Sequence, residues 1–389
     1  MDSSSIVPSS MKGLHLDLDR FDISGPTHMM SKHGAGSSPL LIDWGKEEHR
    51  RCVAACLVKG VYVMENDIHK RRVYSSDALA PPWWNTFGFR PLDVIKDDKL
   101  IFGIIYEYEA AAGLVHHPSA PRYVVAFRGT MLGHLKTLTE DTRYNVMVMR
   151  NTLPESPRAK ISRKEVEKLL RRITNNANAT RFTTAVHDGN KTHATNCDVW
   201  LAGHSLGASV ALDVGRVMVA KNGFNLPTFL FNPPQVSLPP AIDKLTSRLE
   251  KLKKNMYMTS YIMKAGLGKV VKPFKPHKER MKKLFEKLSH WAPELYVHEE
   301  DMICKGYIDY FEQRQQVQER LLIVARSAMM LSYRDMVCHV LGKEKEQPHL
   351  LPSARLWKNT SMHGGAHDLQ LWWKPDGELN LNATKYSYP

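Results

Sequence analysis

The residues with the clearest chemical potential are Gly203-His204-Ser205-Leu206-Gly207. The pattern Gly-x-Ser-x-Gly is typical of a sharp turn between a strand and a helix, where the serine backbone is strained and its Oγ projects from the sheet. Glycines two positions before and after the serine let neighbouring backbone approach without Cβ clashes. Ser205 is therefore a candidate nucleophile, and Gly203 and Gly207 are the glycines that its turn requires.

The sequence around this motif fits a strand, a turn and a helix. The apolar run 199–202 predicts a buried strand before Ser205, and the small residues after Gly207 predict a helix over 208–221. The free N–H groups at the start of that helix, near Leu206, would point at a developing oxyanion. A glycine-rich turn without chemistry is the alternative interpretation, and this context disfavours it.

A second motif lies upstream, where the apolar strand 123–127 ends at Arg128-Gly129-Thr130. Together with the serine motif, and in this order, it resembles the class 3 lipases, especially the plant lipase-like proteins of that group. The resemblance extends from about Trp44 to the C-terminus. It implies an α/β-hydrolase fold, with a mainly parallel central sheet and helices on both faces. It also implies hydrolysis of lipid acyl esters.

The resemblance further implies an oxyanion hole made by the backbone N–H groups of Thr130 and Leu206, with the Thr130 hydroxyl as a third candidate donor. Thr130 as a residue that only caps a turn at a strand end is the alternative. The hydrolases named after a Gly-Asp-Ser-Leu block are not indicated, because the sequence contains no such block.

In this family the catalytic residues follow the order Ser, Asp, His. An acidic loop follows the predicted strand 294–297, and Asp301 matches the family position best, with Glu300 as the fallback. Its role would be to accept Nδ1–H of the histidine and so to set the tautomer and orientation of the ring. A solvated acidic loop without a catalytic role is the alternative.

The general base is expected near the C-terminus. The segment from Ala366-His367 to the tryptophan pair 372–373 resembles the corresponding family block, so His367 is the candidate and His363 its rival. We interpret residues 363–365 as a flexible loop that lets His367 reach Ser205. The expected reaction is acyl transfer to water through an acyl-enzyme, and it needs no metal or organic cofactor.

Further apolar runs predict strands at 101–108, 228–231 and 294–297, a helix over 44–66 and helices within 307–340, while residues 348–389 look rich in loops. Strands that alternate with helices favour a mainly parallel sheet. Four aromatic residues at 83, 84, 87 and 89 belong either to an acyl pocket or to the core.

The chain has 389 residues, of which 43% are hydrophobic and 24% are charged, a composition typical of a globular protein. Residues 1–40 are rich in Ser, Gly and His, and we expect them to be mostly disordered. Residues 41–389 are expected to form one α/β domain. The alternative to an enzyme is a catalytically silent lipase-like scaffold that binds partners. The sequence does not indicate an oligomeric state.

The net charge of +14 is concentrated in residues 251–287, which contain twelve Lys or Arg and two acids, a balance of +10. We therefore expect residues 240–290 to form a basic helical cap. Basic residues beside apolar ones in this segment favour peripheral contact with an anionic membrane. A solvated cap loop is the alternative. A nucleic-acid partner is not indicated, because no recognisable binding module is present.

The sequence also bears on location. It contains no run of 18 apolar residues, and its first ten residues lack the pattern of a secretory signal. The five cysteines are odd in number and match no disulfide or zinc framework, so buried thiols are expected. These features predict a cytoplasmic protein, with peripheral membrane contact as an option.

Overall fold

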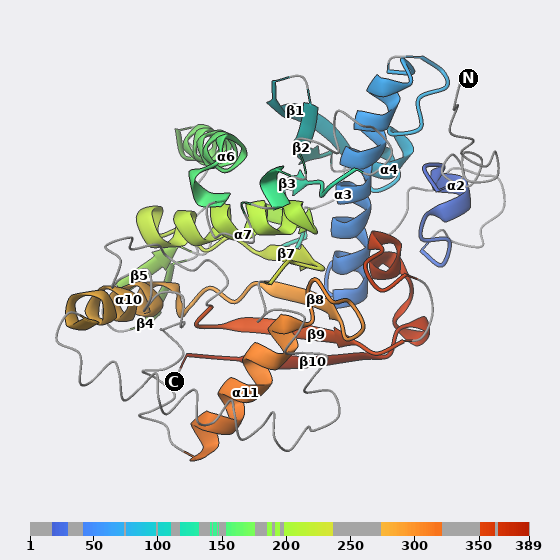
Figure 1. Ribbon diagram of the computed structural model, residues 1–389. Helices are drawn as coiled ribbons and strands as arrows, with labels where there is room; N and C mark the ends of the chain where they lie inside the picture. Colours follow the sequence, from blue (N-terminus) through green and yellow to red (C-terminus); the bar gives the residue numbers. More distant parts are fainter. Residues whose placement is uncertain are drawn as a thin grey trace, which may run out of the picture.

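The computed structural model describes residues 18–29, 42–73, 75–98, 100–109, 117–131, 141, 143–145, 147, 153–175, 185–188, 191–194, 198–235, 274–320, 351–361 and 365–388. Its centre is an eight-stranded sheet with the strand order β1-β2-β3-β6-β7-β8-β9-β10 (Figure 1).

The middle of the sheet is parallel. Its strands are β3 (Tyr123–Phe127), β6 (Val199–His204), β7 (Thr228–Phe231), β8 (Glu294–His298) and β9 (Ala354–Asn359). β3, β6 and β7 are buried along their whole length, which explains why their sequences are continuous apolar runs. Because the carboxyl ends of parallel strands share one edge, the residues that follow these strands meet there. The predicted mainly parallel sheet is confirmed.

Antiparallel strands complete both edges of the sheet. They are β1 (Phe89–Asp97) and β2 (Leu100–Tyr108) at one edge and β10 (Leu381–Tyr386) at the other. The prediction of a loop-rich tail was wrong in this respect, because the tail contains β9 and β10. β10 is mostly exposed and polar, so its sequence lacks the alternation that signals a strand. A separate two-stranded sheet is formed by the hairpin of β4 (Ala185–Asp188) and β5 (Lys191–Ala194).

Side chains that alternate along the central strands face two separate cores. Val125, Leu201 and Leu230 belong to one, and Ala126, Trp200 and Phe229 belong to the other. The first core is covered by α6 (Pro157–Asn175), α7 (Leu206–Val217) and α11 (Gly306–Arg320), and the second by α3 (Glu47–His69). Helices therefore cover both faces of the sheet, as predicted (Figure 1).

The aromatic block is part of the second core. Trp83, Trp84, Phe87 and Phe89 are all buried there, the first two in the short helix α4 (Pro82–Asn85). The core interpretation of these residues is thus confirmed. Cys52, Cys56 and Cys304 are buried free thiols, also as predicted.

Part of the N-terminal segment packs against this core. Helix α2 (Phe21–Ser24) places Phe21 edge-on to Trp83, with ring centroids 5.1 Å apart, and Trp83 Nε1 donates to Asp19 O across 2.8 Å. Residues 1–17 and 30–41 lie outside the described residues, so the expected disorder of 1–40 stays a prediction there.

The basic segment is described only from residue 274, as α10 (Phe274–Leu288). It packs beside η2 (Met218–Asn222), where Lys287 Nζ donates to Ala220 O across 3.5 Å. Since η2 follows α7, α10 lies at the end of α7 remote from Ser205. The remaining short helices are η1 (Leu153–Glu155), η3 (Leu369–Trp373) and η4 (Asp376–Glu378). No helix in the described ranges is long and apolar enough to cross a membrane.

Candidate active site

Ser205 occupies the turn between β6 and α7, at the carboxyl end of the strand. Its φ of 53° and ψ of −125° lie where an L-residue is strained. Its backbone N–H donates to Phe231 O across 2.9 Å. A Cβ at Gly203 would lie 2.3 Å from Gly207 O, and one at Gly207 would lie 2.3 Å from Phe127 O. Both positions therefore require glycine.

His367 and Asp301 lie beside this serine. His367 Nε2 is 2.9 Å from Ser205 Oγ, and His367 Nδ1 is 2.7 Å from Asp301 Oδ2. Because an ionised carboxylate only accepts hydrogen bonds, Nδ1 carries the proton and Nε2 faces the serine as an acceptor. The three residues singled out in the sequence as nucleophile, base and acid are thus brought together. The rival His363 lies outside the described residues.

Asp301 is buried among donors. Oδ2 accepts from Asn232 Nδ2 at 2.7 Å and from Cys304 Sγ at 2.9 Å, and Oδ1 accepts from the N–H of Ile303 at 2.9 Å. Burial by itself would raise the pKa of Asp301, but the bonds from His367, Cys304 and Ile303 outweigh it and lower the pKa to about 2. The carboxylate is therefore ionised at neutral pH. The neighbouring Glu300 is exposed.

Asn232 was not foreseen in the sequence. It follows β7 in a left-handed conformation (φ 46°), which asparagine tolerates better than most residues. Besides Asp301, its Nδ2 lies 3.0 Å from Ala366 O, and its Oδ1 accepts from Trp372 Nε1. It therefore links the acid to the segment that carries the histidine. The signal in the sequence that could have found it is its place directly after a buried strand, as for Ser205.

The loop of Thr130 packs directly against the serine turn. A Cβ at Gly129 would lie 2.8 Å from Ser205 Cβ, so only glycine permits this approach. The N–H of Gly129 donates to Tyr62 Oη across 2.6 Å, and that of Met131 donates to Asp141 Oδ2 across 3.0 Å. The amide of Thr130 lies between these two committed amides. The hydroxyl oxygen of Thr130, Oγ1, accepts from Asn145 Nδ2 at 2.9 Å.

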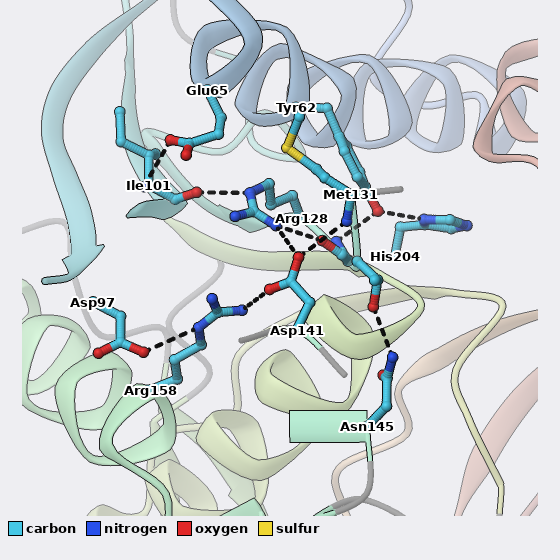
Figure 2. A network of polar contacts seen from close by, with 12 residues as sticks. Tyr62, Glu65, Asp97, Ile101, Arg128, Met131, Asp141, Asn145, Arg158 and His204 are labelled. Carbon is cyan, nitrogen blue, oxygen red and sulfur yellow. Dashed lines mark hydrogen bonds and ion pairs between the residues drawn. The ribbon is translucent and has the colours of Figure 1, made fainter. Parts of the chain in front are cut away.

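A buried ionic network supports this loop (Figure 2). Asp141 lies between Arg128 and Arg158, with contacts of 3.0 and 2.6 Å, and Arg158 also reaches Asp97 at 3.4 Å. Arg128 donates to Ile101 O and Gly129 O, both at 2.7 Å. Two cations and two anions therefore balance here and hold the strand end that carries Thr130.

His204, next to the serine, is also buried. Its Nδ1 is 2.8 Å from Tyr62 Oη, and its Nε2 is 3.0 Å from His367 O. Burial is the main cause that lowers the pKa of His204 to about 3, and the neighbouring His367 lowers it further. His204 is thus neutral at physiological pH. Helix α7 starts at Leu206, and the N–H group at this first position has no acceptor within the helix, whereas the N–H groups of Ala208 and Ser209 donate to Ser205 O.

A strained serine between a strand and a helix, with a histidine and an acid at the same edge of a mainly parallel sheet, defines an α/β-hydrolase. Comparison with known proteins narrows the class. The family described as "Lipase (class 3)" matches residues 124–257. A protein of Arabidopsis thaliana named "GDSL esterase/lipase At4g10955" is 33% identical over 384 residues, which cover 95% of this chain and 98% of that protein.

The chain therefore belongs to the class 3 lipase family. No solved structure matches it. Although the name of the Arabidopsis relative refers to a Gly-Asp-Ser-Leu block, this chain carries Gly203-His204-Ser205-Leu206.

Proposed function

We propose that the protein is a serine hydrolase that cleaves acyl esters of lipids through a Ser205-His367-Asp301 triad and an acyl-enzyme. The observation that carries the proposal is the continuous hydrogen-bonded path from Asp301 to His367 and Ser205, with contacts of 2.7 and 2.9 Å. Membership of the class 3 lipase family and the name of the Arabidopsis relative support a lipid ester as the substrate.

In the proposed reaction, Ser205 Oγ attacks the ester carbonyl while His367 Nε2 takes its proton. The ionised Asp301 stabilises the resulting imidazolium by accepting its Nδ1–H. The tetrahedral intermediate collapses when His367 gives its proton to the leaving alcohol. Water, deprotonated by the same His367, then attacks the acyl-enzyme and releases the fatty acid.

The oxyanion of both tetrahedral intermediates is assigned to the N–H groups of Thr130 and Leu206. Leu206 lies at the start of α7, where the helix dipole favours negative charge. Thr130 is favoured over its neighbours because the amides of Gly129 and Met131 already donate to Tyr62 and Asp141. The hydroxyl of Thr130 retains its own hydrogen as a further donor.

Peripheral contact with an anionic membrane through residues 251–287, and a cytoplasmic location, belong to the same proposal. Arg280, Lys282 and Lys283 are exposed on α10, whereas Met281 and Phe285 are buried. The described part of this basic surface thus presents exposed cationic side chains on one helix, as contact with anionic lipid headgroups requires. Sedimentation with vesicles tests it: retention on phosphatidylserine vesicles but not on neutral ones is expected, and equal behaviour would reject the contact.

Ester hydrolysis tests the catalytic proposal. Purified protein should hydrolyse p-nitrophenyl butyrate and longer esters, and Asp301→Asn should lower kcat by about 10³- to 10⁴-fold. Ser205→Ala and His367→Ala should be impaired at least as strongly. Ser209→Ala, which removes a second buried hydroxyl in α7, is the matched control and should stay active. A folded wild type that turns over no ester, with or without vesicles, would favour the scaffold instead.

A further inference from the structure

Tyr62 and His204 join two parts of the site that are far apart in the sequence. Tyr62 belongs to α3 and His204 to β6, yet Tyr62 Oη and His204 Nδ1 are 2.8 Å apart. Tyr62 Oη also lies 2.6 Å from Gly129 N, and His204 Nε2 lies 3.0 Å from His367 O. Figure 2 shows Tyr62 and His204 facing each other, with Arg128 and Met131 beside them.

The chemistry of the end groups sets the direction of every bond in this chain. The carbonyl of His367 can only accept, so Nε2 of His204 carries the hydrogen. A neutral His204 then has a bare Nδ1, which accepts from the Tyr62 hydroxyl. The same hydroxyl oxygen accepts from the backbone N–H of Gly129. The series of hydrogen bonds therefore runs from Gly129 through Tyr62 and His204 to His367, with one donor and one acceptor in each bond.

Both ends of this chain lie at reacting groups. Gly129 directly precedes Thr130, and its backbone packs against Ser205 so closely that an added Cβ would come within 2.8 Å of Ser205 Cβ. At the other end, His204 binds the backbone of the residue whose ring faces Ser205 Oγ. A shift of either end would be passed to the other through two buried or half-buried side chains.

We propose that Tyr62 and His204 are positioning residues, which together hold the strand end that carries the Thr130 amide in register with the backbone of His367. This inference rests on the proposed hydrolysis. Neither side chain touches the scissile bond in this role. Each acts through a residue that does.

His204 can accept a hydrogen bond from Tyr62 and donate one to His367 only if its ring stays uncharged. Its ring centroid is 5.2 Å from that of His367, so a charged His204 would oppose the imidazolium that forms on His367 during each turnover. The other titratable groups that act on His204 are Asp301, Lys59 and Tyr62. Burial keeps His204 neutral, and burial raises the pKa of Tyr62, so its hydroxyl stays protonated and can donate.

Kinetics of the full chain with p-nitrophenyl butyrate test the proposal, with Ser205→Ala as the measure of background. Tyr62→Phe and His204→Phe should each lower kcat by about 10- to 100-fold while KM changes little, because a misplacement of this kind raises the barrier without removing substrate contacts. His204→Gln, which can still donate to His367 O, should recover part of the loss. Tyr106→Phe is the matched control, since Tyr106 is buried and its hydroxyl donates to Leu57 O of α3 across 3.1 Å, away from His204 and Gly129.

The double variant Tyr62→Phe/His204→Phe distinguishes a shared chain from two separate contacts. A shared chain predicts that the double variant is no slower than the slower single variant. Losses that multiply, or a kcat of Tyr62→Phe equal to that of Tyr106→Phe, would overturn the proposal.

Nitrogen-15 spectra of histidine-labelled protein test the hydrogen bonds of His204 without any substrate. The signal that is lost in His204→Phe should show a neutral ring with hydrogen on Nε2 from pH 8 to 5. Hydrogen on Nδ1, or a charged ring in this range, would overturn the chain itself. If the wild type hydrolyses no ester while the spectra agree, the proposed function fails and the positioning role fails with it.

Discussion

The side-chain amide of Asn232 donates to Asp301 Oδ2 across 2.7 Å, so the oxygen that faces His367 is held from a second direction. The same amide reaches Ala366 O, one residue before the histidine. Asn232 thus links the Asp301 carboxylate to the backbone beside His367, the two residues that we propose as acid and base.

Removal of this amide should impair the reaction more than substrate binding. Asn232→Gly is the suitable change, because glycine adopts the left-handed backbone of residue 232 without strain. We expect kcat to fall by about 10- to 100-fold with little change in KM. The buried Trp372 N–H loses its acceptor, so the free energy of unfolding should also fall by about 1–3 kcal/mol. An unchanged kcat in a destabilised protein would show that Asn232 serves stability alone.

The buried Asp141 should be essential for stability. Asp141→Asn leaves Arg128 and Arg158 without their shared anion, so the free energy of unfolding should fall by about 3–5 kcal/mol. Denaturant unfolding measures this loss. Because Asp141 also accepts from the Met131 amide beside Thr130, kcat should fall as well.

Asp67→Asn is the control for this prediction. Asp67 is buried and pairs with Arg72 at 2.7 Å, and it accepts from the amides of Leu79 and Ala80 rather than from the Thr130 loop. The Asp67→Asn variant should have a lower free energy of unfolding than the wild type and an unchanged kcat. Equal kcat values for the two variants would contradict a role of Asp141 in holding the loop.

Because the backbone of Ser205 is strained, we predict that a residue which relieves this strain raises the free energy of unfolding. A conformation of this kind costs about 1–3 kcal/mol in an L-residue, and glycine relieves it. Ser205→Gly should therefore be more stable than Ser205→Ala by about 1 kcal/mol, after the greater freedom of glycine in the unfolded chain is subtracted. Thermal unfolding of the two inactive variants checks this. A lower stability of Ser205→Gly would contradict the strain.

Because His204 is buried and neutral, we predict that the free energy of unfolding falls on acidification. Its pKa is about 3 in the folded protein and near the ordinary value of 6.5 in the unfolded chain, so below pH 6.5 only the unfolded chain takes up the proton. The contribution is complete above pH 6.5 and is lost as the pH falls toward 3. At about pH 4.5 the wild type should have lost on the order of 2–3 kcal/mol more than His204→Phe. Parallel pH profiles of the two proteins would contradict a neutral His204.

The sequence predicted those parts of the site whose residues are close neighbours in the chain. The turn at Ser205 was readable because a buried strand, two required glycines and a small-residue helix stand side by side in the chain. The choice between Asp301 and Glu300 stayed open, because adjacent carboxylates differ only in burial and partners, which arise when β8 and β9 pair. Strands β1, β9 and β10 were missed, since their polar edges lack a clean period of two.

Tyr62 and Asn232 were missed for a different reason. Tyr62 sits between two valines of α3 and reads as part of an apolar helix face, and only the packing of α3 over β6 brings it to His204. Asn232 lies 69 residues from Asp301. Contacts of this range depend on the order of strands in the sheet, which no local pattern encodes.

The most direct test of the proposed hydrolase is covalent labelling of Ser205. The folded wild type is treated with a fluorophosphonate, and the labelled peptide is identified by mass spectrometry. We predict one adduct, on the Ser205 peptide, that is absent in Ser205→Ala and strongly slowed in His367→Ala but unchanged in Ser209→Ala. Absence of an adduct on the folded wild type, with vesicles present and absent, or an adduct on another serine, would contradict the account.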